Sequence, residues 1–233
     1  MHRLIQVCFL AALLTFGSAI HNAEAQGNAE AQGLTGYGFK AIAASSTTTD
    51  YLAGQEESLW GVGVAAFAEW HIAGPLSVMP HLEYAPRGVN QLFAAGNDGG
   101  GFQSTRAETR LHYLSLPLFA KASYRFDETP FVLYAMLGPR IDLLIGSDSE
   151  TFEFEDESIS SGLAQRYDQT AFGISGGVGL QITLSEDIAL MFEARQHRDV
   201  TASVGEGGTQ LVDTTVGDMR NLATDFSVGI KWQ

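Results

Sequence analysis

The chain repeats one pattern eight times, in which apolar residues alternate with small or polar residues at every second position. In the segment 60–72, for example, Val62, Val64 and Trp70 share one face. A period of two is typical of a β-strand with two different environments on its faces. With 26 Gly and only 17% charged residues, the composition excludes a disordered chain and argues against a helix bundle. The predicted strands cover residues 37–44, 60–72, 76–87, 112–126, 131–144, 172–182, 188–197 and 222–232.

The predicted connections alternate between tight turns and long polar loops. The tight turns are 73–75, 127–130 and 185–187, and the long loops are 46–57, 92–107, 147–167 and 204–218. An up-and-down meander places all the turns at one end and all the loops at the other, as in outer-membrane barrels. The predicted fold is therefore all-β: an eight-stranded antiparallel up-and-down transmembrane β-barrel that forms one domain, residues 34–233.

Charge decides which face of the strands points inward. One row is rich in Gly, Ala and Ser, which suit the narrow interior of an eight-stranded barrel, and the other is rich in residues that suit hydrocarbon. A Lys or Arg at the bilayer midplane would cost about 2 to 4 kcal/mol. Seven cations and five anions on the inward row predict a lumen held by ion pairs, without a diffusive pore. These residues are Lys40, Glu69, Glu83, Arg87, Lys121, Arg125, Arg140, Asp142, Glu193, Arg195, Asp225 and Lys231. A soluble lipocalin-like barrel, with inverted faces and a ligand-lined cavity, is the alternative.

Aromatic residues gather near the predicted strand ends. Side chains of this type anchor membrane proteins at the two lipid–water interfaces. The candidates are Trp60, Trp70, Tyr84, Tyr124, Phe126, Phe131 and Trp232.

The first 25 residues have the pattern of a cleaved secretory signal peptide. Arg3 precedes the apolar run 4–20, and Ala23-Glu24-Ala25 forms a small-residue cleavage site. The hexapeptide at 22–27 recurs at 28–33, so cleavage after Ala31 is equally well formed, and an uncleaved membrane anchor is a further alternative. Residues 26–33 would then be a short segment before the barrel. The single cysteine, Cys8, lies within the signal, which excludes disulfides and thiol catalysis in the mature chain.

The net charge limits the partners. With 13 Lys and Arg against 27 Asp and Glu, the formal charge is −14, which argues against nucleic acid. We expect a monomer in the outer membrane that contacts outer-membrane lipid and lipopolysaccharide. The long loops, above all 92–107 and 147–167, are candidates for contact with an envelope or extracellular protein.

Several motifs carry a family resemblance that spans the mature chain. They are Gly38-Phe39-Lys40-Ala41, the tyrosine-to-proline stretch 111–118, Tyr134 with Gly138-Pro139-Arg140, and the glycine-rich segment 172–180. With these motifs the sequence resembles the outer-membrane β-barrel domain family that includes PorT-like proteins of the Bacteroidota. The resemblance implies an eight-stranded outer-membrane barrel, and most members have no assigned activity.

One segment invites comparison with lipid A deacylases and acyltransferases, some of which are eight-stranded barrels with a histidine and a Ser or Asp near the outer rim. Gln196-His197-Arg198-Asp199 ends the seventh predicted strand, and Thr201 and Ser203 follow. A serine nucleophile beside His197 would be needed, and Arg198 occupies that place. We therefore predict no enzyme and no catalytic residues, with His197 an ordinary residue of the rim or lumen.

Metal and cofactor signals are weak. His71 and His81 could approach each other across a hairpin, but two histidines rarely make a metal site. The chain also lacks the Gly-Lys-Ser/Thr of a phosphate-binding loop. An acidic cluster in the longest loop lacks the order and the turn glycine of an EF-hand, so a solvated loop is expected, with weak divalent-cation binding as the alternative. It comprises Asp148, Glu150, Glu153, Glu155, Asp156 and Glu157. We predict no cofactor and no resident metal.

Overall fold

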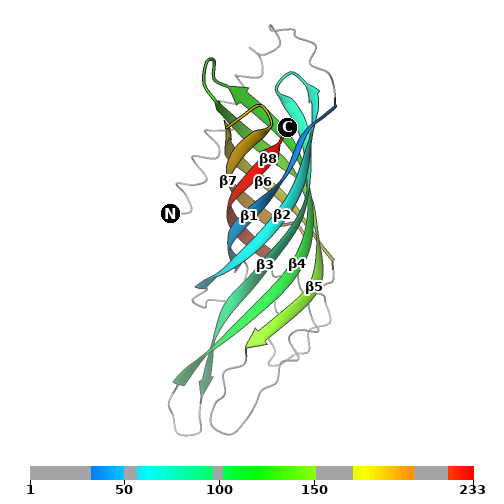
Figure 1. Ribbon diagram of the computed structural model, residues 1–233. Helices are drawn as coiled ribbons and strands as arrows, with labels where there is room; N and C mark the ends of the chain where they lie inside the picture. Colours follow the sequence, from blue (N-terminus) through cyan, green and yellow to red (C-terminus); the bar gives the residue numbers. More distant parts are fainter. Residues whose placement is uncertain (1–32, 50–56, 97–101, 151–169, 202–219) are drawn as a thin grey trace.

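The computed structural model describes residues 33–49, 57–96, 102–150, 170–201 and 220–233. In it eight antiparallel strands follow one another around a closed barrel (Figure 1). The barrel closes between the first and last strands, where Phe39 lies opposite Ile230. The predicted fold class is therefore confirmed. The strands are β1 (Gly33–Thr49), β2 (Glu57–Ala73), β3 (Leu76–Gly96), β4 (Phe102–Arg125), β5 (Phe131–Glu150), β6 (Thr170–Thr183), β7 (Ile188–Asp199) and β8 (Arg220–Trp232).

Tight turns join β2 to β3, β4 to β5 and β6 to β7 at one end of the barrel, as predicted. In the first turn Gly74 has a φ of 51°, a conformation that glycine adopts without steric cost. In the last turn the backbone amides of Leu184 and Ser185 both donate to the carbonyl of Ile188. The long connections all leave from the opposite end, which is called the long-loop end below. Among the described residues, no helix is long and apolar enough to cross a membrane.

Several strands extend further toward the long-loop end than the sequence pattern predicts. The pairing of β3 with β4 continues until Gly96 lies opposite Phe102, so 92–96 and 102–107 are strand and not loop. In Figure 1 these two strands reach beyond their neighbours. Ladder hydrogen bonds continue here although the apolar alternation has ended, because backbone pairing does not require an apolar face. Parts of the other predicted loops are also strand, since β1 reaches Thr49 and β5 reaches Glu150; the remaining parts lie outside the described residues.

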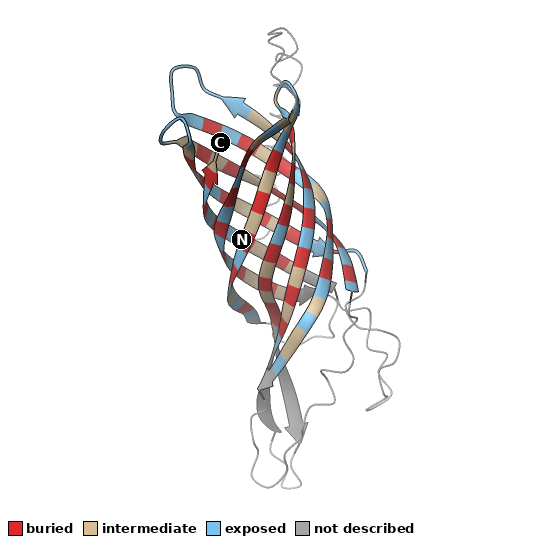
Figure 2. Ribbon diagram, turned by 45° about the vertical axis from the view of Figure 1, so that its right-hand side comes forward, coloured by how far each residue is buried: buried red, intermediate tan, exposed pale blue. Residues whose placement is uncertain are grey.

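Burial alternates along the strands with a period of two, as Figure 2 shows. Outward-facing Val62 is 76% exposed, whereas inward-facing Ala65 is 3% exposed. Eleven of the twelve charged residues predicted to point inward are buried. The exception is Arg125, which is exposed because it is the last residue of β4, where the strand leaves the barrel for the turn. The structure also buries Asp199, which the predicted row did not include.

The predicted aromatic residues lie on the outward face, either exposed or half-buried, and all but one lie near a strand end. The exception is Tyr84, which lies well inside β3 because that strand continues to Gly96. Trp232 also closes the seam between β8 and β1. Its ring centroid lies 6.0 Å from that of Tyr37 and 6.2 Å from that of Phe39, two aromatic residues that the sequence pattern missed.

The inward apolar side chains form a small core within the lumen, which includes Phe67, Met79 and Phe119. Tyr134 belongs to this core and its ring covers Gly179 on β6, its direct partner across the β5–β6 pair. A Cβ atom at Gly179 would lie 2.2 Å from Cζ of Tyr134, so no larger residue fits without moving the ring. Glycine on the inward row thus makes room for large side chains from neighbouring strands.

The outward apolar row can be tested with a charge. Leu137→Arg places a guanidinium on the lipid-facing surface of β5, and we expect a loss of about 2 to 4 kcal/mol in the free energy of unfolding. Reversible unfolding in lipid bilayers measures this quantity. Leu184→Arg, in the turn after β6, is the matched control and should cost little, because Leu184 is already exposed beyond the strands. Equal losses at both positions would contradict the assignment of the lipid-facing row.

Candidate functional site

Charged side chains run through the lumen from one end to the other. In the described part of the chain six cations and six anions are buried inside the barrel, so these charges balance when the two buried histidines, His81 and His197, are neutral. The sequence pattern predicted seven cations and five anions, and the difference is Arg125, which is outside, and Asp199, which is inside. The prediction of interior ion pairs is confirmed, and they form four connected clusters.

The first cluster lies near the tight turns and is centred on Glu69 of β2. Its carboxylate accepts hydrogen bonds from Lys121 Nζ of β4 at 2.9 and 3.0 Å and from Lys231 Nζ of β8 at 2.8 Å. Ser77 of β3 donates a further hydrogen bond at 2.8 Å. One carboxylate therefore ties together four strands.

The second cluster is centred on Glu193 of β7. Lys40 Nζ donates to its carboxylate at 2.5 Å, the hydroxyl of Tyr134 at 2.7 Å and the hydroxyl of Ser227 at 3.2 Å. The ammonium of Lys40 also lies 4.3 Å from the centroid of the Phe67 ring, a distance suited to a cation–π contact.

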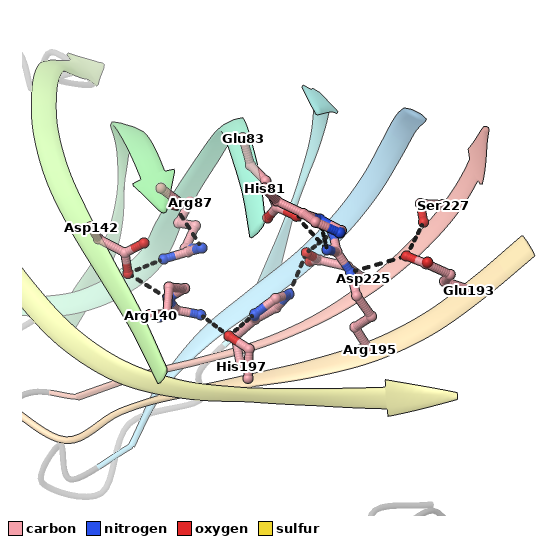
Figure 3. A network of polar contacts seen from close by, with 12 residues as sticks. His81, Glu83, Arg87, Arg140, Asp142, Glu193, Arg195, His197, Asp225 and Ser227 are labelled. Atoms are coloured by element: carbon pink, nitrogen blue, oxygen red, sulfur yellow. Dashed lines mark hydrogen bonds and ion pairs between the residues drawn. The ribbon is translucent and has the colours of Figure 1, made fainter. Parts of the chain in front are cut away.

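The third cluster surrounds Arg195 and is shown in Figure 3. Its guanidinium donates to Glu83 of β3 and lies 3.5 Å from Oδ2 of Asp225 on β8. Nδ1 of His81 lies 2.8 Å from the same Glu83 oxygen. Arg195 thus spans the width of the lumen.

The fourth cluster lies nearest the long-loop end. Asp142 Oδ2 is 2.7 Å from Nη1 of Arg87 and 2.7 Å from Nε of Arg140 (Figure 3). Arg140 also donates to Oδ1 of Asp199 at 2.5 Å. These pairs join β3, β5 and β7.

A serine and an aspartate flank His197, which the sequence had not placed together. Ser175 Oγ lies 2.7 Å from Nδ1 of His197, and Asp225 Oδ2 lies 2.6 Å from Nε2. With neutral His197, the carboxylate must accept from Nε2–H, so Nδ1 accepts from the hydroxyl of Ser175. The three residues resemble a Ser–His–Asp triad in composition. The exposed fractions are 0% for Ser175 and 1% for both His197 and Asp225, which does not suit a nucleophile that must meet a substrate.

The sequence analysis considered only a serine next to His197 in the chain. The serine that contacts His197 lies instead on the neighbouring strand, β6. Counting back from the tight turn 185–187 would have found it. Gln181 lies opposite Met191, and six residues further from the turn Ser175 lies opposite His197. The register of a hairpin with a short turn was therefore a usable signal.

The other candidates do not assemble into a site. Across the β2–β3 pair, His71 lies opposite Ser77 and His81 lies opposite Phe67, so the two histidines are separated along the hairpin. Arg198 points outward, whereas its neighbour Asp199 pairs with Arg140 inside. Among the described residues, no group of three or more His, Cys, Asp or Glu side chains could hold a metal.

Two further sets of candidates are only partly described. Thr201 accepts a hydrogen bond from the backbone amide of Phe172 at 2.9 Å, whereas Ser203 lies outside the described residues. Asp148 and Glu150 belong to β5 and not to a loop. The other members of the acidic cluster, Glu153, Glu155, Asp156 and Glu157, lie outside the described residues.

A second chain of hydrogen bonds around a histidine lies on the outward face, and sequence reasoning missed it. The hydroxyl of Tyr84 lies 2.7 Å from Nδ1 of His112, and Nε2 of the same ring lies 2.8 Å from Oδ2 of Asp148. The three residues belong to the adjacent strands β3, β4 and β5. Unlike Ser175, these side chains are accessible in part.

A family model described as the outer membrane protein beta-barrel domain matches residues 8–233. Among solved structures, Neisserial surface protein A is similar, with 16% identity, coverage of 86% of this chain and 98% of that chain, and a TM-score of 0.46. OprG from Pseudomonas aeruginosa has 12% identity, coverage of 84% and 95%, and a TM-score of 0.45. The outer membrane protease OmpT from Escherichia coli has 8% identity, coverage of 88% and 99%, and a TM-score of 0.45. No curated protein matches the sequence.

The lumen clusters can be tested at Glu193. Lys40→Met removes the nearest cation and leaves a buried carboxylate undercompensated, so we expect a loss of about 3 to 5 kcal/mol in the free energy of unfolding. Ser227→Ala is the matched control, because it removes one neutral hydrogen bond to the same carboxylate and should cost about 1 kcal/mol. Unfolding in bilayers measures both. A Lys40→Met barrel as stable as the Ser227→Ala barrel would show that the ion pair is not needed.

Because Ser175 is buried, we predict that its hydroxyl does not react with probes of serine hydrolases. In the folded barrel we expect no labelling by a fluorophosphonate probe, because the hydroxyl is fully buried. Labelling followed by mass spectrometry of the adduct checks this, with Ser175→Ala as the background control. Stoichiometric labelling of Ser175 would mean that the lumen opens and that the Ser–His–Asp arrangement must be considered catalytic.

Proposed function

Because the chain belongs to the outer membrane protein β-barrel domain family, we propose that it is a non-enzymatic outer-membrane barrel that presents its long loops to a partner. The observation that carries this proposal is the charge-balanced set of buried ion pairs in the lumen. Paired charges on facing strands brace the wall from within, and side chains fill the lumen of a barrel of this size. The barrel is then an anchor rather than a channel.

The proposal includes a route to the membrane and an orientation in it. Residues 1–25 serve as a cleaved signal peptide, and the tight turns face the periplasm, as is usual for outer-membrane barrels. The long-loop end then faces the cell exterior. Within the family, we propose that the chain is one of the PorT-like proteins. The resemblance rests on the stretch 111–118 in β4 and on Gly138-Pro139-Arg140 in β5.

A non-enzymatic role is supported by the surroundings of the one Ser–His–Asp arrangement among the described residues. Its serine is sealed among ion pairs, with Nη1 of Arg140 at 3.5 Å from the hydroxyl. A lipid A-modifying enzyme, the competing proposal, would need a nucleophile that a membrane lipid can reach. Under our proposal the wild-type protein does not modify the lipid A of the membrane. Membranes that contain the His197→Ala variant therefore have the same lipid A as membranes that contain the wild type.

The long-loop end is the proposed surface for partners. The paired ends of β3 and β4 reach beyond the neighbouring strands there (Figure 1), and strand edges that extend past their neighbours offer backbone groups to another molecule. The partner is an envelope or extracellular protein, and the lipid and lipopolysaccharide of the outer membrane surround the monomeric barrel.

Exchange of the loops tests the proposal. Replacing 97–101 and 151–169 together with short Gly-Ser connections should abolish co-purification of the crosslinked partner from intact cells. Exchange of the tight turn 127–130 for another short turn is the matched control and should leave the partner bound. If the loop-exchanged protein retains the same crosslinked partner, the proposed role of the loops is wrong.

Each variant must first be shown to be an inserted barrel. Outer-membrane fractionation, with gel mobility compared before and after boiling, serves this purpose, because a closed barrel resists unfolding by detergent until it is heated. Recovery of the wild-type protein as a soluble periplasmic protein would overturn the whole proposal and restore the lipocalin-like alternative.

A further inference from the structure

Tyr84, His112 and Asp148, called the outer platform here, form a hydrogen-bonded group that the proposed function leaves unused. The side chain of Asp148 is 75% exposed and that of His112 is 23% exposed. Tyr84 is half-buried on the outward row. The chemistry matches that of Ser175, His197 and Asp225, where a hydroxyl and a carboxylate flank one imidazole, but here an external molecule can reach the group.

The geometry of the outer platform suits a ligand that presents one apolar ring face and polar groups at its edge. The rings of Tyr84 and His112 are nearly parallel, with an interplanar angle of 5° and centroids 6.0 Å apart. The hydrogen bond of 2.7 Å joins the hydroxyl edge of one ring to the nitrogen edge of the other. Asp148 holds the imidazole from its other side, at 2.8 Å. Two aligned rings with a carboxylate beside them therefore lie on the barrel wall.

The position of the outer platform limits what can reach it. Toward the tight-turn end the same three strands carry exposed apolar side chains, including Leu82, Leu116 and Ile141. Toward the long-loop end Arg110 is exposed and lies opposite Asp148 in the β4–β5 pair. The outer platform therefore lies at the border between the apolar belt and the polar end. Under the proposed function, on which this inference rests, that border meets the headgroups of the outer leaflet.

We propose that the outer platform binds the phosphorylated sugar headgroup of an outer-leaflet glycolipid. The C–H face of a pyranose ring packs against flat rings such as those of Tyr84 and His112. The carboxylate of Asp148 accepts hydrogen bonds from sugar hydroxyl or amino groups. The guanidinium of Arg110 suits a phosphate on the same headgroup. A phospholipid supplies the phosphate but has no sugar ring to pack on the platform.

Lipid retention by the purified barrel tests this inference. The full-length protein, as processed by the cell, is inserted into phosphatidylglycerol bilayers that contain lipid A and then extracted with detergent. Mass spectrometry counts the lipid A molecules that remain on each barrel. We expect Asp148→Ala, which removes the carboxylate proposed to accept hydrogen bonds from the sugar, to lower the affinity for lipid A about tenfold, the loss expected for one hydrogen bond to a charged group. Tyr84→Ala, which removes one of the two rings on which the sugar packs, should also lower the affinity.

Tyr124→Ala is the matched control for Tyr84→Ala, because Tyr124 is likewise an outward-facing tyrosine but lies near the tight turns. It should retain lipid A as the wild type does. The inference is overturned if the platform variants retain as much lipid A as the wild type, if Tyr124→Ala loses as much as they do, or if phosphatidylglycerol is retained equally well. Only barrels with heat-dependent gel mobility are compared, so failure of the proposed function would appear earlier, as absence of a membrane-inserted barrel.

Discussion

A charged side chain inside a narrow barrel has to meet an opposite charge, and the rest of this structure depends on that constraint. A carboxylate removed from water and left unpaired would cost several kcal/mol. Glu69 meets Lys121 and Lys231 and Glu193 meets Lys40, all from other strands. Asp142 meets Arg87 of β3 and Arg140 of its own strand, β5. The pairs between strands join residues that are distant in sequence, so they also fix how the wall closes. Stability and closure thus have the same physical origin.

The same constraint explains why two groups of similar chemistry have different roles on the inner and outer faces of the barrel wall. Ser175, His197 and Asp225 are held among arginines in the sealed interior, so their arrangement serves the structure. Tyr84, His112 and Asp148 repeat the hydroxyl–imidazole–carboxylate order on the outside. Accessibility, and not residue type, separates a structural group from a candidate binding site.

Much of the wall could be predicted from the sequence, because each strand must satisfy two environments at once. The period of two located all eight strands and the inward direction of residues such as Glu83 and Arg195. It failed at the long-loop end, where the apolar alternation in the sequence ends before the strands do. The strands β3 and β4 therefore extend past the point where the pattern ends. The inward direction predicted for Arg125 was wrong for a similar reason. Arg125 is the last residue of β4, and beyond the barrel wall both directions from the strand lead to the outside.

The sequence by itself determined the fold class, the two faces of every strand and the presence of ion pairs in the lumen. The alternation of residue types along each strand is enough for these three conclusions, because it reflects whether each face meets lipid or the lumen. Only the tertiary structure decided which charge pairs with which, and that Asp225 meets His197 while Tyr84 meets His112. Those contacts depend on the register between neighbouring strands and on the closure of β1 on β8, where groups nearly two hundred residues apart become neighbours, as Tyr37 and Trp232 do.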